Sequence, residues 1–224
     1  KGTIKINGQR IRGIIFDMDG TLLDSMEAWK NIGIDYLKYK GCNPSADVSE
    51  KLKDMSLKQS AEYFQSAYGI NESQEEIMDC INFLIADKYK YSIQPKPTAV
   101  EFIIKLHAKG VKMCVATATD RHHVEAALKR LNILQYFCGL ITCREAGHGK
   151  NEPTIYHKAL EMLGVDKTEA LVFEDAFYAI ETAKAAGYSV VAVEDKFSQD
   201  DDEKEKIIEV ADWYIKSFDE LEID

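Results

Sequence analysis

The 224-residue chain is poor in cysteine, proline and tryptophan, with five, four and two residues of these types. An odd number of cysteines at scattered spacings excludes a framework of disulfides and does not match the ligand spacing of a zinc site. We expect most of these side chains to be buried thiols, because unpaired cysteine behaves as a small apolar residue. They are Cys42, Cys80, Cys114, Cys138 and Cys143.

The chain also lacks a long apolar run. No stretch approaches the 18 or so residues that a membrane-spanning helix needs, and no signal-peptide pattern opens the sequence. We therefore expect a cytoplasmic protein with no membrane partner. Residue 1 is Lys and not Met, so we expect this start to be a trimmed or tagged one.

Basic residues are scarce relative to acidic ones. The chain has 28 Lys and Arg against 38 Asp and Glu, a formal net charge of −10. This balance argues against nucleic acid or an anionic membrane as a partner, because both repel a negative surface. An anionic substrate would need local cations that overcome the global field. The composition indicates no oligomeric state.

The most informative segment that is present begins at Gly13. A short apolar run, long enough for a buried strand, ends in Asp17 and Asp19, followed by Gly and Thr. Two carboxylates at the end of a buried strand are unfavourable unless a cation, usually a metal, lies beside them. A hairpin at Asp19-Gly20 would require a second alternating strand, but the apolar residues from Met26 onward have helical spacing.

The pattern along the chain indicates an α/β protein with an insertion. Asn7-Gly8 suggests a small hairpin, residues 13–16 a strand, and residues from 25 to about 91 only helices. After Pro95 and Pro97, helices alternate with apolar strands near 111–116, 139–142, 170–173 and 189–193. Such alternation predicts a parallel sheet covered by helices on both faces. We expect a core domain of residues 1–24 and 93–224 and an inserted all-helical domain of residues 25–92.

Polar residues follow several of the expected strands. Asp17 and Asp19 follow the first, Thr117 ends the strand at 111–116, and Glu174 and Asp175 end the strand at 170–173. Ligands of open parallel sheets bind beyond the carboxyl ends of the strands, so these side chains are expected to meet. Taken singly, each has a plainer interpretation: Thr117 or the Glu174-Asp175 pair could cap the helix that follows.

Three histidines receive no functional role from the sequence. His122 and His123 open a helix, and we expect both to be exposed, whereas His107 is expected to be packed.

The motifs together resemble those of the haloacid dehalogenase superfamily. The resemblance rests on the run from Asp17 to Ser25, on Thr117, on Lys150 and on the Glu174-Asp175 pair, and it extends from about residue 13 to 193. It implies a Rossmann-like α/β core. The helical insertion resembles the small cap of beta-phosphoglucomutase and phosphoglycolate phosphatase.

The resemblance implies a role for each motif residue. Asp17 would be the nucleophile that forms an aspartyl-phosphate, and Asp19 the general acid and base. Thr117, Lys150 and the backbone N–H groups of Met18 and Ala118 would bind the phosphoryl group. The cofactor would be Mg²⁺, a cation that prefers oxygen ligands. Its ligands would be Asp17, Asp175, the backbone carbonyl of Asp19 and, directly or through water, Glu174.

Departures from the family pattern bear on the reaction. Trp29 stands where beta-phosphoglucomutase-like proteins carry a cap His, and Leu57 where they carry a cap Arg. Lys150-Asn151-Glu152-Pro153-Thr154 also replaces the common Lys-Pro-x-Pro-Asp. Without the cap His and Arg, water is the favoured phosphoryl acceptor. We therefore expect a phosphatase, with a sugar phosphomutase as the alternative.

The expected substrate is a small phosphorylated metabolite, such as a sugar phosphate. In the helical insertion, the candidate substrate contacts are Trp29, Lys53, Ser56 and Lys58. A third interpretation is a catalytically silent phosphate-binding module, which the presence of all the charged motif residues disfavours.

Overall fold

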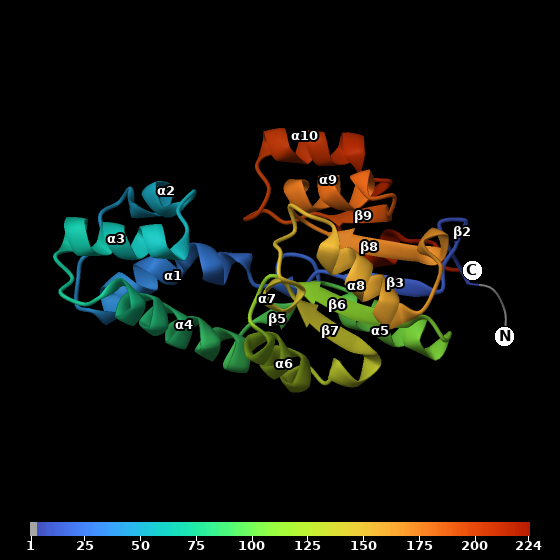
Figure 1. The fold of residues 1–224 in the computed structure, drawn as a ribbon, viewed down its shortest axis with the longest axis horizontal. Coiled ribbons are helices and arrows are strands. Elements are labelled where there is room, and N and C mark those ends of the chain that lie inside the picture. Colours follow the sequence, from blue (N-terminus) through green and yellow to red (C-terminus); the bar gives the residue numbers. More distant parts are fainter. Residues whose placement is uncertain (1–3) are drawn as a thin grey trace. The chain divides into compact units, whose positions relative to one another are not determined.

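The computed structural model describes residues 4–224, and the chain divides into two compact units. One combines the segment ending at Asp24 with Gln94–Asp224, and the other is Ser25–Ile93 (Figure 1). The first three positions of the expected core segment 1–24 lie outside the described residues.

The helical unit consists of four consecutive helices: α1 (Met26–Tyr39), α2 (Val48–Leu52), α3 (Leu57–Tyr68) and α4 (Gln74–Tyr91). In α4, Ile77, Ile81, Ile85 and Tyr89 are buried at every fourth position, which gives the helix one apolar face. Helix α3 starts at a capping box of Ser56 and Gln59. Among residues 4–224, no helix combines the length and apolar character needed to cross a bilayer.

The α/β unit opens with a hairpin. Strands β1 (Lys5–Ile6) and β2 (Gln9–Arg10) pair across Asn7-Gly8, where both residues have positive φ (49° and 80°), as the tight turn of a hairpin requires. Strands β4 (Leu23–Asp24) and β5 (Gln94–Pro95) form a second antiparallel pair.

Strands and helices alternate along the rest of the α/β unit. They are β3 (Gly13–Phe16), α5 (Ala99–Ala108), β6 (Lys112–Thr117), α6 (Arg121–Arg130), η1 (Leu134–Tyr136), β7 (Gly139–Thr142), α7 (Cys143–Ala146), α8 (Thr154–Leu163), η2 (Lys167–Glu169), β8 (Ala170–Glu174), α9 (Phe177–Ala185), β9 (Ser189–Val193), α10 (Asp201–Val210), β10 (Trp213–Ile215) and η3 (Phe218–Glu220).

A six-stranded sheet has the order β10-β9-β8-β3-β6-β7, and its neighbouring strands pair in parallel. The first core strand, β3, therefore lies between β6 and β8. The chain runs outward from β3 through β6 to β7 and then returns to β8 on the other side. This reversal is the place where open α/β sheets bind ligands.

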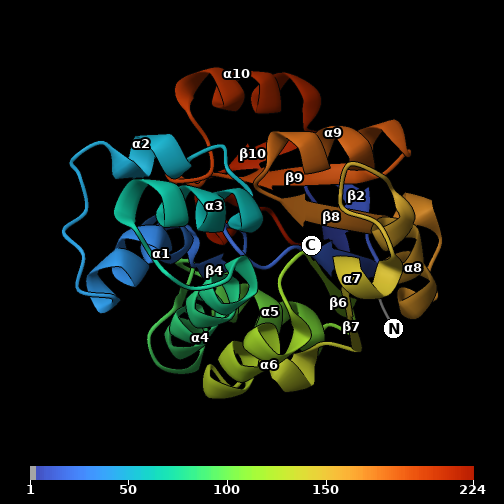
Figure 2. The ribbon, with the colours of Figure 1, turned by 60° about the vertical axis from the view of Figure 1, so that its left-hand side comes forward.

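Helices pack on both faces of this sheet, because successive side chains of each strand point to opposite sides. Ile15 packs with residues of α8 and α9, such as Ala159 and Ile180. The next residue, Phe16, contacts Phe102 of α5 on the other face, with ring centroids 6.3 Å apart. Figure 2 shows α9 and α10 beside β9 and β10, and α6 beside β7. The predicted parallel sheet with two helical layers is confirmed.

Two histidine predictions are wrong. His123 is buried, with 3% of its surface exposed, because it lies on the same face of α6 as the buried Ala127, one turn later. His107 is exposed and rests edge-on against the ring of Tyr136. Apolar spacing alone does not indicate which helical face meets the sheet.

Candidate active site

The candidate site lies beyond the carboxyl ends of β8, β3 and β6. Phe16 is in register with Phe173 of β8 and Val115 of β6. The next residue along β3, Asp17, donates its N–H to the Phe173 carbonyl at 3.0 Å, which places it level with Glu174. Strand pairing by itself thus gathers the acidic residues that end β8 beside the one that follows β3.

Three buried carboxyl groups, those of Asp17, Glu174 and Asp175, meet at this edge, with one oxygen of each within 4.8 Å of the others. The hydroxyl of Thr21 lies 3.1 Å from Asp17 Oδ2 and 3.2 Å from Asp175 Oδ1. Thr21 is itself fully buried. It therefore ties the strand-end loop of β3 to the strand end of β8.

Lys150 supplies the positive charge of the cluster. Its Nζ donates to Asp17 Oδ1 at 2.6 Å and to Glu174 Oε1 at 2.7 Å, and only 4% of the residue is exposed. The hydroxyl of Tyr156, on α8, donates to the same oxygen of Glu174 at 2.6 Å. A buried ion pair is favourable only when further hydrogen bonds satisfy its remaining polar capacity, and Tyr156 supplies one such bond to Glu174.

The pKa shifts follow from burial and from the charges within the cluster. Burial alone would raise the pKa of Asp17, but the Lys150 ammonium and hydrogen bonds outweigh it and hold the pKa below its ordinary value. Burial and the Asp17 charge raise the pKa of Glu174 to about 8 and that of Asp175 well above its ordinary value. Burial opposes the charge on Lys150, yet the Asp17 and Glu174 carboxylates raise its pKa.

This donor set fits a hard divalent cation. The cluster holds three carboxyl groups and one ammonium, and the Asp17 charge adds to burial in raising the pKa of Glu174 and Asp175. A doubly charged cation would balance the excess of carboxyl groups. Ligation by carboxylate oxygens alone is typical of magnesium, calcium or manganese and not of zinc or copper.

Asp19 lies near these residues but has different surroundings. It is partly exposed, and its Oδ2 accepts a hydrogen bond of 2.5 Å from the hydroxyl of Thr119. Asp19 thus remains accessible to solvent while Asp17 is almost enclosed, with 8% of its surface exposed. Two acids separated by one residue have opposite environments, as two carboxyl groups with different chemical tasks require.

The other residues expected to bind phosphate lie at two strand ends. Thr117 is buried at the end of β6, and its hydroxyl accepts the N–H of Thr119 at 3.1 Å, not that of a residue in α6. Ala118 follows it on the surface, and the side chain of Met18 is buried beside the first acid. The interpretation of Thr117 and of the Glu174-Asp175 pair as helix caps finds no support. The N-cap residues of α6 and α9 are Asp120 and Ala176, and neither makes a side-chain capping hydrogen bond.

The four candidate residues of the helical unit have distinct surroundings. The indole N–H of Trp29 donates to the hydroxyl of Tyr89 at 2.7 Å, which joins α1 to α4. The hydroxyl of Ser56 accepts the N–H of Gln59 as the cap of α3. Lys53 and Lys58 are exposed.

Thr21, Thr119 and Tyr156 contact the site residues but have no role predicted from the sequence. Thr21 and Thr119 follow Asp17 and Thr117 within the same motifs, so a search for hydroxyls just after each strand end would have found them. Tyr156 carries no such signal, because its position on α8 has the apolar spacing of an ordinary core residue. Only the structure identifies the partner of its hydroxyl, although a buried Tyr usually forms a hydrogen bond with some polar group.

Comparisons with known proteins agree with this geometry. A family model of haloacid dehalogenase-like hydrolases matches residues 11–187. A fructose-1-phosphate phosphatase from Escherichia coli strain K12 is 26% identical over 198 residues, or 83% of this chain and 97% of its own length. A validoxylamine A 7'-phosphate phosphatase from Streptomyces hygroscopicus subsp. limoneus is 30% identical over 191 residues, or 80% and 84%.

Among solved structures, a candidate beta-phosphoglucomutase from Thermotoga maritima superposes with a TM-score of 0.81 at 23% identity, covering 92% of this chain and 94% of its own. That likeness supports the fold. The curated relatives confirm the expectation of a phosphoric monoester hydrolase. The family match spans the sheet strands β3, β6, β7 and β8 and every site residue described above, so the chain belongs to the haloacid dehalogenase-like hydrolases.

Proposed function

We propose that this chain is a Mg²⁺-dependent phosphatase of a small phosphorylated metabolite and that it works through an aspartyl-phosphate on Asp17. The observation that carries the proposal is the convergence of Asp17, Glu174 and Asp175 beyond the ends of neighbouring parallel strands, with the Lys150 ammonium bonded to the first two. Burying so many charges in one place is costly, and a chain retains such a cluster where its chemistry needs it.

Asp17, Asp175 and the backbone carbonyl of Asp19 would hold the Mg²⁺, with Glu174 as a further ligand directly or through water. When bound, the cation neutralises charge on the phosphoryl oxygens. The buried carboxylates and the excess negative charge of the cluster support this assignment.

In the first step, a carboxylate oxygen of Asp17 attacks phosphorus, and the bond from phosphorus to the substrate oxygen breaks. Asp19 gives its proton to that leaving oxygen. The lowered pKa of Asp17 supports its role as nucleophile, since the ionised form attacks. The partial exposure of Asp19 supports its role as the acid, since its proton must reach the substrate.

In the second step, water attacks the phosphorus of the aspartyl-phosphate and loses a proton to Asp19. The bond between phosphorus and Asp17 then breaks, which regenerates the Asp17 carboxylate and releases phosphate. The hydrogen bond from Thr119 holds the Asp19 carboxyl in place for both proton transfers. Splitting the hydrolysis in this way replaces one difficult step by two easier ones.

The phosphoryl oxygens would be held by Thr117, Lys150 and the backbone N–H groups of Met18 and Ala118. The Thr117 hydroxyl already accepts the N–H of Thr119, so its own proton can be donated to a phosphoryl oxygen. Lys150 adds a fixed positive charge, which stabilises the charge that spreads over the phosphoryl group during transfer.

The domain assignment forms part of the proposal: residues 1–24 and 93–224 as the catalytic core and 25–92 as a cap that selects the substrate. The names of relatives, a phosphorylated carbohydrates phosphatase from Thermotoga maritima among them, support a sugar or polyol phosphate as substrate. Of the cap candidates, Lys53 and Lys58 have the better support, because Trp29 and Ser56 use a polar atom within the helical unit.

The nucleophile is tested by Asp17→Asn. We expect the rate of p-nitrophenyl phosphate hydrolysis in Mg²⁺ to fall at least about a thousandfold, because the amide is not a nucleophile. The readouts are phosphate release and the capture of a phosphoenzyme in the unaltered chain. Asp202→Asn, on the exposed first turn of α10, is the matched control and should keep its activity. Near-normal turnover by Asp17→Asn would refute the assignment, and equal rates in Mg²⁺ and in excess chelator would refute the metal.

The phosphomutase alternative predicts a different product. A hexose 1-phosphate with a catalytic amount of the hexose bisphosphate would yield the 6-phosphate isomer without free phosphate. The phosphatase releases one phosphate per substrate consumed. Counting both products in the same reaction separates the two functions.

A further inference from the structure

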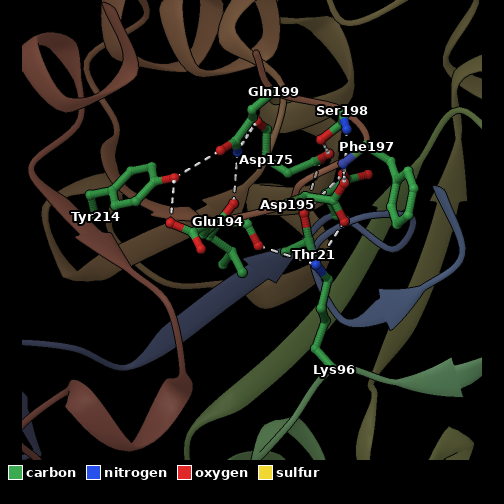
Figure 3. A network of polar contacts seen from close by, with 11 residues as sticks. Thr21, Lys96, Asp175, Glu194, Asp195, Phe197, Ser198, Gln199 and Tyr214 are labelled. Carbon is green, nitrogen blue, oxygen red and sulfur yellow. Dashed lines mark hydrogen bonds and ion pairs between the residues drawn. The ribbon is translucent and has the colours of Figure 1, made fainter. Parts of the chain in front are cut away.

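The segment that follows β9 lies against the candidate metal ligand Asp175 (Figure 3). The hydroxyl of Ser198 donates to Asp175 Oδ2 at 2.6 Å. The side-chain amide of the next residue, Gln199, donates to the Asp175 carbonyl at 2.6 Å and to the Val193 carbonyl at 2.9 Å. Both the carboxylate and the backbone of Asp175 are thus held from a neighbouring strand end.

A buried acid shapes this segment. Asp195 has 2% of its surface exposed, and its Oδ1 accepts the backbone N–H groups of Phe197 at 2.9 Å and Ser198 at 2.8 Å. A side chain that accepts the N–H groups two and three residues onward forms a tight local turn. Asp195 therefore sets the position of the Ser198 backbone.

Lys96, immediately after β5, anchors that acid. Its Nζ lies 2.7 Å from Asp195 Oδ2 and 3.1 Å from the Glu194 carbonyl. The pair is almost enclosed, with side-chain exposures of 12% for Lys96 and 1% for Asp195. A well-bonded, enclosed ion pair resists displacement, because separating the charges would leave one of them buried alone.

Gln199 is fixed at its other end as well. The hydroxyl of Tyr214, in β10, donates to Gln199 Oε1 at 2.8 Å, so both polar atoms of the amide are engaged (Figure 3). Besides its contacts with Asp175, the segment is therefore held by Lys96, which follows β5, by Val193 of β9 and by Tyr214 of β10.

We infer that Ser198 is a positioning residue for Asp175 and that it presets this carboxylate to bind the divalent cation. Asp175 Oδ1 accepts from Thr21 and Asp175 Oδ2 from Ser198, so a hydroxyl engages each oxygen and opposes rotation of the group. A ligand that is already oriented loses less freedom when it binds, which raises affinity. The inference rests on the proposed function, in which Asp175 is a metal ligand.

The test is calorimetric titration of the purified, chelator-treated full chain with Mg²⁺ in the absence of substrate. For Ser198→Ala, we expect the dissociation constant to rise about 10- to 100-fold, the usual effect of removing a residue that orients a metal ligand. Ser198→Thr retains the hydroxyl and should restore most of the affinity. Ser189→Ala is the matched control: it removes a hydroxyl at the opposite end of β9, where Ser189 accepts a hydrogen bond from Gln9.

Melting temperatures without metal distinguish positioning from simple stabilisation. Positioning predicts that Ser198→Ala weakens Mg²⁺ binding much more than Ser189→Ala does, even if both variants melt at similar temperatures. An unchanged Mg²⁺ affinity in Ser198→Ala would overturn the inference while leaving the proposed function intact. If the unaltered chain binds no Mg²⁺, the metal assignment and the inference fail together.

Discussion

The two units of this chain have different interiors. In the α/β unit, the described buried residues include Asp17, Lys150, Glu174, Asp175 and Asp195. In the described helical unit, the buried side chains are apolar or aromatic except for Ser25 at its first position. The α/β unit therefore bears the desolvation free energy of several buried charges, whereas the described helical unit buries no charged side chain.

The difference indicates how well each unit tolerates the substitution of a charged residue. Each buried charge of the α/β unit depends on a partner, so replacing one residue leaves another unsatisfied. The charges of the helical unit lie at its surface, where a substitution usually alters stability very little. The proposed chemistry thus lies in the unit that tolerates substitution less, and the proposed selection of substrate in the unit that tolerates it more.

Among substitutions that contrast the two units, the largest effect should follow from Lys150→Met, which removes the ammonium shared by Asp17 and Glu174. We expect kcat for p-nitrophenyl phosphate to fall about 10²–10³-fold or more, the usual loss when one preorganised charge stabiliser is removed. The melting temperature should fall too, because two buried carboxyls lose their counter-charge. Steady-state kinetics and thermal denaturation measure both; unaltered kcat would show that the buried cluster is not the catalytic centre.

A core substitution in the helical unit should affect stability and not chemistry. Phe64 is fully buried and stacks on Tyr36, with ring centroids 5.3 Å apart. Phe64→Ala should lower the free energy of unfolding by about 3–5 kcal/mol, measured by urea denaturation followed by circular dichroism. At temperatures where the variant stays folded, kcat for p-nitrophenyl phosphate should remain that of the unaltered chain. A fall in kcat as large as that expected for Lys150→Met would contradict the assignment of the chemistry to the α/β unit alone.

The smallest effect should come from the surface of the helical unit. Lys53→Ala and Lys58→Ala should each raise KM for a sugar phosphate by up to about fivefold, since an exposed ion pair contributes about 1 kcal/mol or less. Hydrolysis of p-nitrophenyl phosphate should change less, because it lacks the sugar hydroxyls that a selective cap would contact. Lys105→Ala, an exposed lysine of α5, is the control. Equal effects on both substrates would argue against a selective role.

Much of the fold could be predicted because its signals are local. The strand ending at Phe16 has the predicted limits, and β9 begins and ends as expected at 189 and 193. The expected strands at 111–116 and 170–173 are Lys112–Thr117 and Ala170–Glu174. Runs of apolar residues between helix-ending glycines specify such elements without reference to distant parts of the chain.

The contacts between site residues have no local signal of this kind, and only the resemblance to a family placed Lys150 beside Asp17. Thr21 and Asp175 are 154 positions apart, and Lys150 and Asp17 are 133 apart. Such pairs depend on strand order and register, which the pattern of one strand does not contain. The hydrogen bond from Ser198 to Asp175 likewise depends on β9 lying beside β8.

The amino-acid sequence by itself determined which acids follow the strands, the alternation of strands and helices, and the helical insertion, because residue type and periodicity are properties of neighbouring positions. Only the tertiary structure decided that Tyr156, Thr119 and Ser198 support the acids and that His123 is buried. The reason is geometric: parallel pairing brings together strand ends from distant segments, and the choice of neighbours belongs to the packed sheet as a whole.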